Sequence, residues 1–177
     1  MIDVAKKFAT RKFQEAGTEN HFLEVYQILK NKFHVQDEEV LVAGILHDTL
    51  ENTETTYEEI SEVFSKSVAN LVEEVSHPKN YNAQQKKEYY EKIKHISKGG
   101  KLIKLADFAS HLATFNDSFA GENDLPKFTH NEYCVYIRSF LESCEDSPAK
   151  EYVARLNDEL DAYITNSPKP VAWIEIE

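Results

Sequence analysis

Glycine, proline and cysteine are scarce in this 177-residue chain, which has 5 glycines, 5 prolines and 2 cysteines. Average usage, about 7% glycine and about 5% proline, would give roughly twelve glycines and nine prolines at this length. The shortage disfavours turn-rich β architectures and predicts an all-α fold. Cys134 and Cys144 lack the Cys-x-x-Cys spacing of a zinc knuckle, so we expect reduced cysteines rather than a disulfide framework.

Long apolar runs and excess positive charge are also missing. No segment reaches the roughly 18 apolar residues of a membrane-spanning helix, and residues 1–7 lack the apolar stretch of a signal peptide. The chain has 20 basic and 31 acidic residues, a net charge of −11, which repels phosphate backbones and anionic lipid. We therefore expect a cytoplasmic protein with no nucleic-acid partner and no membrane contact.

Apolar residues recur along the chain at the spacing of amphipathic helices. The hydrophobic content of 41% is sufficient for one core. We expect a single-domain helical bundle over residues 1–167 and a short tail over residues 168–177. Thr18, Asp37 and Thr56 are expected to cap helices, and Gly99-Gly100 is expected to break the chain. The predicted helices are 2–15, 19–33, 38–50, a short one after Thr56, 66–75, 82–97, 101–115, 128–143 and 148–165.

The helix predicted over residues 38–50 is apolar on all sides and contains His47-Asp48. Two polar groups at the end of a buried helix are costly to bury unless something satisfies them. A divalent metal ion does so for an imidazole and a carboxylate together. The alternative is a hydrogen-bonded pair at an exposed helix end.

Three further residues favour the metal site. His21 begins the preceding predicted helix, Asp107 interrupts a later apolar run, and Glu51 stands four residues after His47, on the same face if the helix continues. Two histidines and two aspartates suit Mn²⁺, Fe²⁺, Co²⁺ or Zn²⁺. Since such an ion activates water and screens phosphate charge, the set outlines a phosphohydrolase site in which Glu51 orients or deprotonates the water.

Several segments carry a resemblance to a known family. In order, these are Glu19-Asn20-His21, the stretch from Gly44 to Thr53 (GILHDTLENT), Leu71 to Val75 (LVEEV) and Lys101 to Asp107 (KLIKLAD). They resemble the HD superfamily of metal-dependent phosphohydrolases. Within it they are most similar to the hydrolase domain of RelA/SpoT proteins and to the small alarmone hydrolases, which remove the 3′-pyrophosphate from guanosine tetra- or pentaphosphate.

The resemblance implies roles for individual residues. It makes His21, His47, Asp48 and Asp107 the ligands of a metal ion, usually manganese. It places Glu51 and Asn52 where the family has a Glu-Asp pair that handles the nucleophilic water, and it matches Arg11-Lys12 to a nucleotide contact. Two departures bear on activity: Asn52 replaces the second acid, and His111 stands where the alarmone hydrolases have an asparagine near the nucleotide.

The positive charge is concentrated in residues 79–104, which carry eight lysines and two glutamates. Most of these lysines fit a solvated helix face. Lys87 and Lys101 are candidate substrate contacts, because the family has basic residues near these positions, and Lys104 lies three residues before Asp107.

The first hypothesis is therefore an HD-domain phosphohydrolase of a nucleotide, with guanosine 3′,5′-bis(diphosphate) as the leading substrate. The alternatives are hydrolysis of another phosphorylated nucleotide, or a catalytically weak HD protein that binds nucleotide. The expected partner is a small-molecule nucleotide, and a homo-oligomer stays possible.

Overall fold

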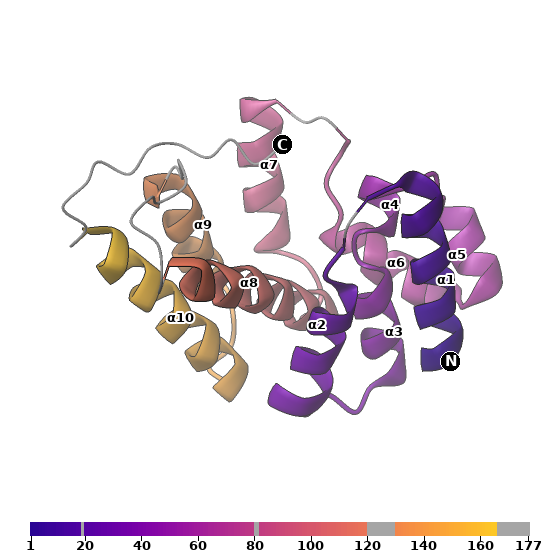
Figure 1. Ribbon diagram of the computed structural model, residues 1–177, viewed down its shortest axis with the longest axis horizontal. Coiled ribbons are helices and arrows are strands. Elements are labelled where there is room, and N and C mark those ends of the chain that lie inside the picture. Colours follow the sequence, from indigo (N-terminus) through magenta and orange to yellow (C-terminus); the bar gives the residue numbers. More distant parts are fainter. Residues whose placement is uncertain (19, 80–81, 120–129, 166–177) are drawn as a thin grey trace. The chain divides into compact units, whose positions relative to one another are not determined.

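The protein is helical throughout the part that the structure, a computed structural model, describes: residues 1–18, 20–79, 82–119 and 130–165 (Figure 1). These residues form no strand, so the all-α prediction is confirmed. The chain divides into two compact units, Met1–Asp107 and Phe108–Glu177. The predicted tail, residues 168–177, lies outside the described residues.

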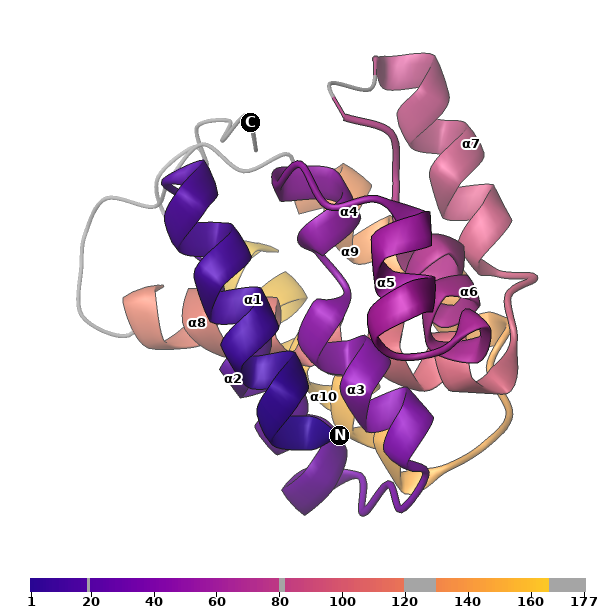
Figure 2. The ribbon, with the colours of Figure 1, turned by 90° about the vertical axis from the view of Figure 1, so that its right-hand side faces the viewer.

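The first unit is built around one buried helix. α3 (Glu38–Leu46) packs against α1 (Ile2–Ala16), α2 (Phe22–Gln27) and α6 (Lys66–Val75), and Figure 2 shows it between α1 and α6. Every residue of α3 from Val40 to Leu46 is buried, as its all-round apolar sequence predicts. The remaining elements of this unit are the π-helix η1 (Ile28–Lys32), α4 (Thr49–Asn52), α5 (Tyr57–Val63), α7 (Ala83–Ile93) and α8 (Lys98–Phe119) up to Asp107.

Side-chain caps set the start of several helices. The Asp37 side chain accepts hydrogen bonds from the backbone N–H groups of Glu39 and Val40, and Thr56 accepts one from Glu59. Each bond satisfies an amide that the first turn leaves unpaired. The predicted caps Asp37 and Thr56 are confirmed, and α6 covers the predicted range 66–75.

Two predicted helices have different limits. α2 begins at Phe22 with His21 as its N-cap, rather than at residue 19 behind a Thr18 cap, and the Asn20 side chain accepts the Phe22 N–H at 2.7 Å. α3 ends at Leu46 rather than continuing to residue 50, and a turn at His47-Asp48 separates it from α4. His47 and Glu51 therefore do not share one helix.

The predicted break at Gly99-Gly100 is wrong, because both residues lie in the first turn of α8. A Cβ atom at position 100 would come within 2.7 Å of the Glu74 carboxylate. Glycine there permits the close approach of α8 to α6 and does not interrupt the helix. The basic helix α7 also ends earlier than predicted, at Ile93.

The second unit contains the rest of α8 together with α9 (His130–Glu142) and α10 (Pro148–Thr165), which pack against each other. The rings of Phe108 and Phe140 meet edge to face with centroids 5.4 Å apart. Cys134 and Cys144 are buried and form no disulfide, as predicted.

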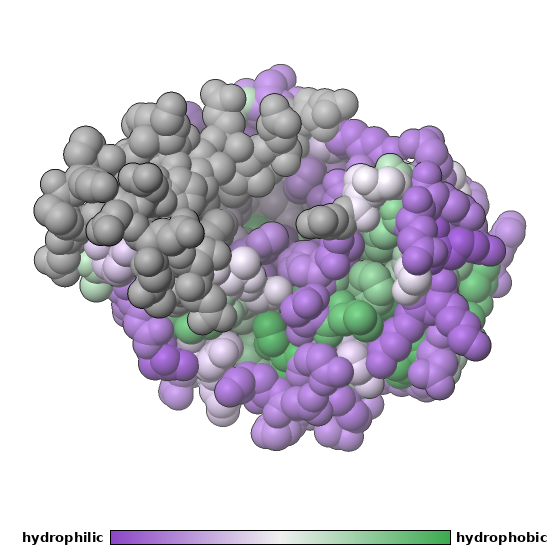
Figure 3. All heavy atoms as spheres, viewed as in Figure 1, coloured by the Kyte–Doolittle hydropathy of each residue, from purple (hydrophilic) through white to green (hydrophobic). Residues whose placement is uncertain are grey.

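None of the helices in the described ranges is both long and apolar enough to cross a membrane. In the view of Figure 3, polar residues cover much of the described surface, and hydrophobic residues lie between them in separate small areas.

Candidate metal and hydrolase site

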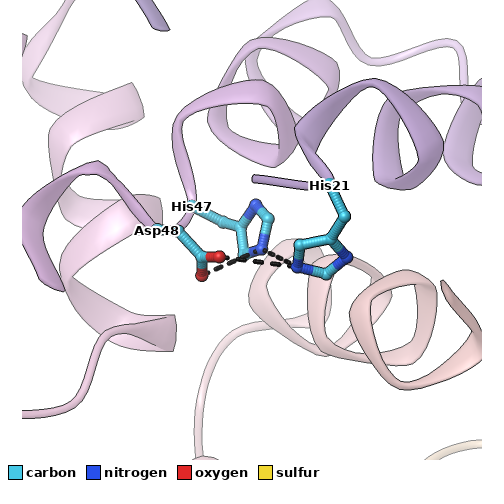
Figure 4. A group of neighbouring side chains, drawn as sticks. All are labelled: His21, His47 and Asp48. Carbon is cyan, nitrogen blue, oxygen red and sulfur yellow. Dashed lines mark hydrogen bonds and ion pairs between the residues drawn. The ribbon is translucent and has the colours of Figure 1, made fainter. Parts of the chain in front are cut away.

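The ends of three helices supply three of the four predicted ligands. His21 is the N-cap of α2, His47 is the C-cap of α3, and Asp48 is the N-cap of α4. Figure 4 shows these three side chains pointing toward one another. Asp107, on α8, completes the set within the first unit. The break after α3 is what directs His47 and Asp48 to one point.

The donor atoms lie close enough to share one ion. Nε2 of His47 is 2.9 Å from Oδ1 of Asp48 and 3.3 Å from Nε2 of His21. Oδ1 of Asp107 lies 3.4 Å from Nε2 of His21 and 3.7 Å from Nε2 of His47. His21, His47 and Asp48 each offer an atom within 4.8 Å of the others, a spacing that can accommodate a metal ion.

His47 is oriented by the helix that carries it. Its Nδ1 lies 2.9 Å from the carbonyl oxygen of Gly44. Because that oxygen can only accept a hydrogen bond, Nδ1 carries the hydrogen. Nε2 faces the other candidate metal ligands. A backbone acceptor behind a histidine is the usual arrangement for a metal ligand.

Charge at the site follows from this arrangement. Burial lowers the pKa of His47, but the adjacent Asp48 more than offsets it and raises the pKa to about 9. Burial also raises the pKa of Asp48, yet the neighbouring His47 and His21 hold it well below its usual range. Asp48 is therefore ionised at neutral pH, as a ligand of a cation must be.

The Oδ2 atoms of both aspartates have further protein partners. Asn20 donates to Oδ2 of Asp48 at 3.0 Å, and Lys104 donates to Oδ2 of Asp107. Lys104 is buried and its pKa is well above its usual value: burial lowers it, but the charge of Asp107 outweighs burial. Lys104 is therefore paired with a candidate metal ligand.

Glu51 lies near this set, on α4, and is held by a residue that the sequence did not single out. The backbone N–H of His77 donates to Oε1 of Glu51 at 2.9 Å, and Nε2 of the same histidine lies 2.8 Å from Oε2. No local pattern connects two residues that are 26 positions apart.

The other predicted site residues are more exposed. Asn52 is exposed at the end of α4. Arg11 is exposed beside Glu15, and Lys12 pairs with Glu59 at 2.7 Å, so these contacts are with acids. The remaining candidates are Lys87, which is exposed on α7, and two α8 residues, the partly buried Lys101 and the exposed His111. Their roles as substrate contacts stay predictions.

The residues fit a divalent ion of the first transition series. Two imidazole nitrogens and two carboxylates converge, and all four side chains are at most 21% exposed. The two carboxylates in this partly buried place repel each other unless a proton or a cation compensates their charge. The mixed nitrogen and oxygen set suits Mn²⁺, Fe²⁺, Co²⁺ or Zn²⁺.

Comparison of the sequence with known proteins gives the same family as the motifs. The profile of the family described as HD domain matches residues 2–123. The chain is 38% identical over 121 residues to the human guanosine-3′,5′-bis(diphosphate) 3′-pyrophosphohydrolase MESH1, covering 63% of this chain and 68% of that protein. It is 39% identical over 98 residues to the zebrafish (Danio rerio) protein of the same name, covering 55% and 54%. The chain thus spans about half the length of the zebrafish relative.

Solved structures show the same fold. A structure described as a metazoan ortholog of SpoT that hydrolyzes ppGpp matches with a TM-score of 0.75 at 22% identity, over 89% of this chain and 94% of that one. A crystal structure of a protein from Listeria monocytogenes matches with a TM-score of 0.68 at 25% identity, over 81% of this chain and 99% of that one.

Proposed function

The chain belongs to the HD domain family, and from this premise we propose that it is a metal-dependent phosphohydrolase of a nucleotide. Its most specific form is removal of the 3′-pyrophosphate from guanosine 3′,5′-bis(diphosphate), the reaction named for the similar human and zebrafish proteins. The observation that carries the proposal is the convergence of His21, His47, Asp48 and Asp107.

These four side chains are proposed to bind the ion, with Mn²⁺ first and Fe²⁺, Co²⁺ or Zn²⁺ as alternatives. When bound, such an ion lowers the pKa of water and neutralises phosphate charge. Three of the proposed ligands have hydrogen-bond partners that hold them in place: His47 bonds to Gly44, Asp48 to Asn20 and Asp107 to Lys104.

Glu51 is proposed as the base. It accepts a proton from the attacking water while the water oxygen bonds to the phosphorus next to the ribose 3′ oxygen. The bond from that phosphorus to the 3′ oxygen breaks, and the 3′ oxygen gains a proton. The products are pyrophosphate and guanosine 5′-diphosphate. Asn52, the next residue, assists by hydrogen bonding, since its amide cannot take up a proton.

The proposed substrate contacts are Arg11, Lys12, Lys87, Lys101 and His111. They supply local positive charge in a chain whose net charge is −11. Because the acidic surface repels long polyanions and a small polyphosphate needs only a local field, we propose a nucleotide rather than a nucleic acid as the ligand.

The test is pyrophosphate release from guanosine 3′,5′-bis(diphosphate) with added Mn²⁺, beside simple nucleotides and phosphorylated dinucleotides. We expect turnover that chelation abolishes and that Asp48→Asn removes, while the fully exposed acid Asp146, changed to Asn, serves as a matched control. Turnover that survives Asp48→Asn or chelation would refute the metal mechanism. Bound metal without turnover on any nucleotide would favour a nucleotide-binding protein instead.

A further inference from the structure

A single residue contacts both carboxylate oxygens of Glu51. The His77 backbone N–H donates to Oε1 at 2.9 Å, and Nε2 of the His77 imidazole lies 2.8 Å from Oε2. The Glu51 side chain is 9% exposed and that of His77 is 25% exposed. Two bonds from one residue fix both the position and the rotation of the carboxylate, which leaves its remaining lone pairs pointing in set directions.

The His77 ring has an acceptor at each nitrogen. Nδ1 lies 2.9 Å from the carbonyl oxygen of Pro78, and Nε2 lies beside the Glu51 carboxylate. Since neither oxygen can donate, both bonds form only when both nitrogens carry hydrogen, which is the imidazolium. Burial lowers the pKa of His77, but the hydrogen bond and charge of Glu51 outweigh burial and raise it above 6.5.

The backbone that carries His77 is fixed by α7. The Tyr89 hydroxyl donates to the carbonyl oxygen of Val75 at 2.7 Å, and the Lys92 ammonium donates to that of Ser76 at 3.2 Å. The Tyr89 ring also meets the His77 ring edge to face, with centroids 5.4 Å apart. Contacts from α7 therefore hold His77 in place in addition to its bonds with Glu51.

Among the described residues, ionisable groups that act on His77 from the elements around it include Glu51 on α4, Tyr89 on α7 and Lys104 on α8. Burial raises the pKa of Tyr89 further above its usual value, so the phenol is neutral. Lys104 opposes a positive charge on His77, but it is itself paired with Asp107. Glu51 is thus the group that sets the charge of His77.

We propose that His77 is a positioning residue that holds the Glu51 carboxylate aimed for proton transfer from the attacking water. The proposal rests on the hydrolase function proposed above. Asn52 adds to its importance, because an amide beside Glu51 cannot take over as proton acceptor. The contact between His77 and Glu51 then determines whether the Glu51 carboxylate is oriented to accept the proton.

Two substitutions separate positioning from mere packing. His77→Phe keeps the backbone N–H and a ring beside Tyr89 but removes the donor to Oε2. His77→Gln keeps a side-chain donor that does not titrate. We expect His77→Phe to lower kcat about 10- to 100-fold, the usual cost of losing an outer-shell partner, with KM within about twofold, and His77→Gln to restore much of the loss. His95→Gln, at an exposed histidine, is the matched control.

The pH profile is the second readout. In the native protein, activity should fall on the basic side as His77 loses its proton and its Nε2 lone pair faces the carboxylate. His77→Gln should lack that fall, whereas a residue that only supports the fold would leave the shape of the profile unchanged. Metal content and the melting temperature of each variant are measured alongside.

The third readout does not need activity. An NMR titration should place the pKa of the His77 ring above 6.5, and Glu51→Gln should lower it. If the native chain hydrolyses no nucleotide, the proposed function fails and the inference fails with it. If the native chain is active but the His77 variants keep its kcat and pH profile, or the titration shows no dependence on Glu51, only the inference is overturned.

Discussion

Nδ1 of His47 lies 2.9 Å from the carbonyl oxygen of Gly44, almost one helical turn earlier in the same buried helix. The bond leaves Nε2 directed at Asp48 and His21. The last turn of α3 thus both ends the helix and orients a candidate metal ligand.

Replacing His47 with Asn tests that orientation. The Asn amide can keep the hydrogen bond to Gly44, but it has no atom at the position of Nε2. We expect the variant to fold and to lose metal. Its activity should fall by more than the roughly 10- to 100-fold expected when only a hydrogen-bond partner of a metal ligand is removed. Elemental analysis of the purified variant checks the metal content, and full metal occupancy would contradict the assignment of His47 as a ligand.

Gly44 itself is required by packing. A Cβ atom there would overlap Cδ1 of Leu29, which is fully buried on η1. We expect Gly44→Ala to destabilise the protein by about 1–3 kcal/mol, the cost of overpacking a core, as measured by urea unfolding. In a double-mutant cycle, Leu29→Ala together with Gly44→Ala should cost less than the sum of the two single changes. Strict additivity would mean that the two sites do not meet.

Removing the metal should lower the melting temperature. Asp48 and Asp107 each place an oxygen beside the same two imidazoles, so an ion bound there stabilises the folded state over the unfolded chain. Binding at one hundred times Kd contributes about 2.7 kcal/mol. Thermal unfolding before chelation, after it and after Mn²⁺ is restored checks this. An unchanged melting temperature would argue against an ion at this place.

The His77–Glu51 pair should make stability depend on pH. The folded-state pKa of His77 is raised above its unfolded value of 6.5, so its contribution is complete below pH 6.5. It is lost as pH rises through the folded pKa. The native protein should therefore exceed His77→Gln in unfolding free energy most clearly at pH 5.5 to 6.5, and the difference should shrink at higher pH. Chemical denaturation across this range measures it, and a constant difference would be the contrary result.

Asn52→Asp is the substitution that should increase activity. It adds a second carboxylate next to Glu51 at an exposed position, where a charge is accommodated without a desolvation cost. If the amide limits hydrolysis of guanosine 3′,5′-bis(diphosphate), kcat should rise, and a steady-state assay on that substrate detects it. An unchanged kcat would show that the natural reaction does not use an acid at this position.

Local signals predicted much of this fold because local bonds determine helix ends. Asp37 and Thr56 were identifiable as caps from sequence, and each accepts the amide bonds expected of it. The predicted break at Gly100 is wrong: this glycine lies within α8, and its nearest side-chain neighbour is the Glu74 carboxylate of a different helix. A contact between distant segments leaves no trace in local periodicity.

Some residues of the candidate site could be predicted from sequence motifs, and others only from the fold. The resemblance identified His21, His47, Asp48 and Asp107, and in the structure each of them has an atom within 3.4 Å of another member of the set. His77 was not identified, because its partner lies in a different helix and its dipeptide with Pro78 resembles an ordinary helix end. Finding it required the fold.

The bonds from Asn20 to Asp48 and from Lys104 to Asp107 carry a consequence for metal selection. Each bond takes up one lone pair of a carboxylate oxygen, so the proposed ion has to share that oxygen with a protein donor in order to bind both oxygens of either aspartate. Ca²⁺ prefers six to eight oxygen ligands, often with bidentate carboxylates, and we therefore expect this competition to disfavour calcium. The two imidazoles among the proposed ligands are expected to favour a smaller, softer ion.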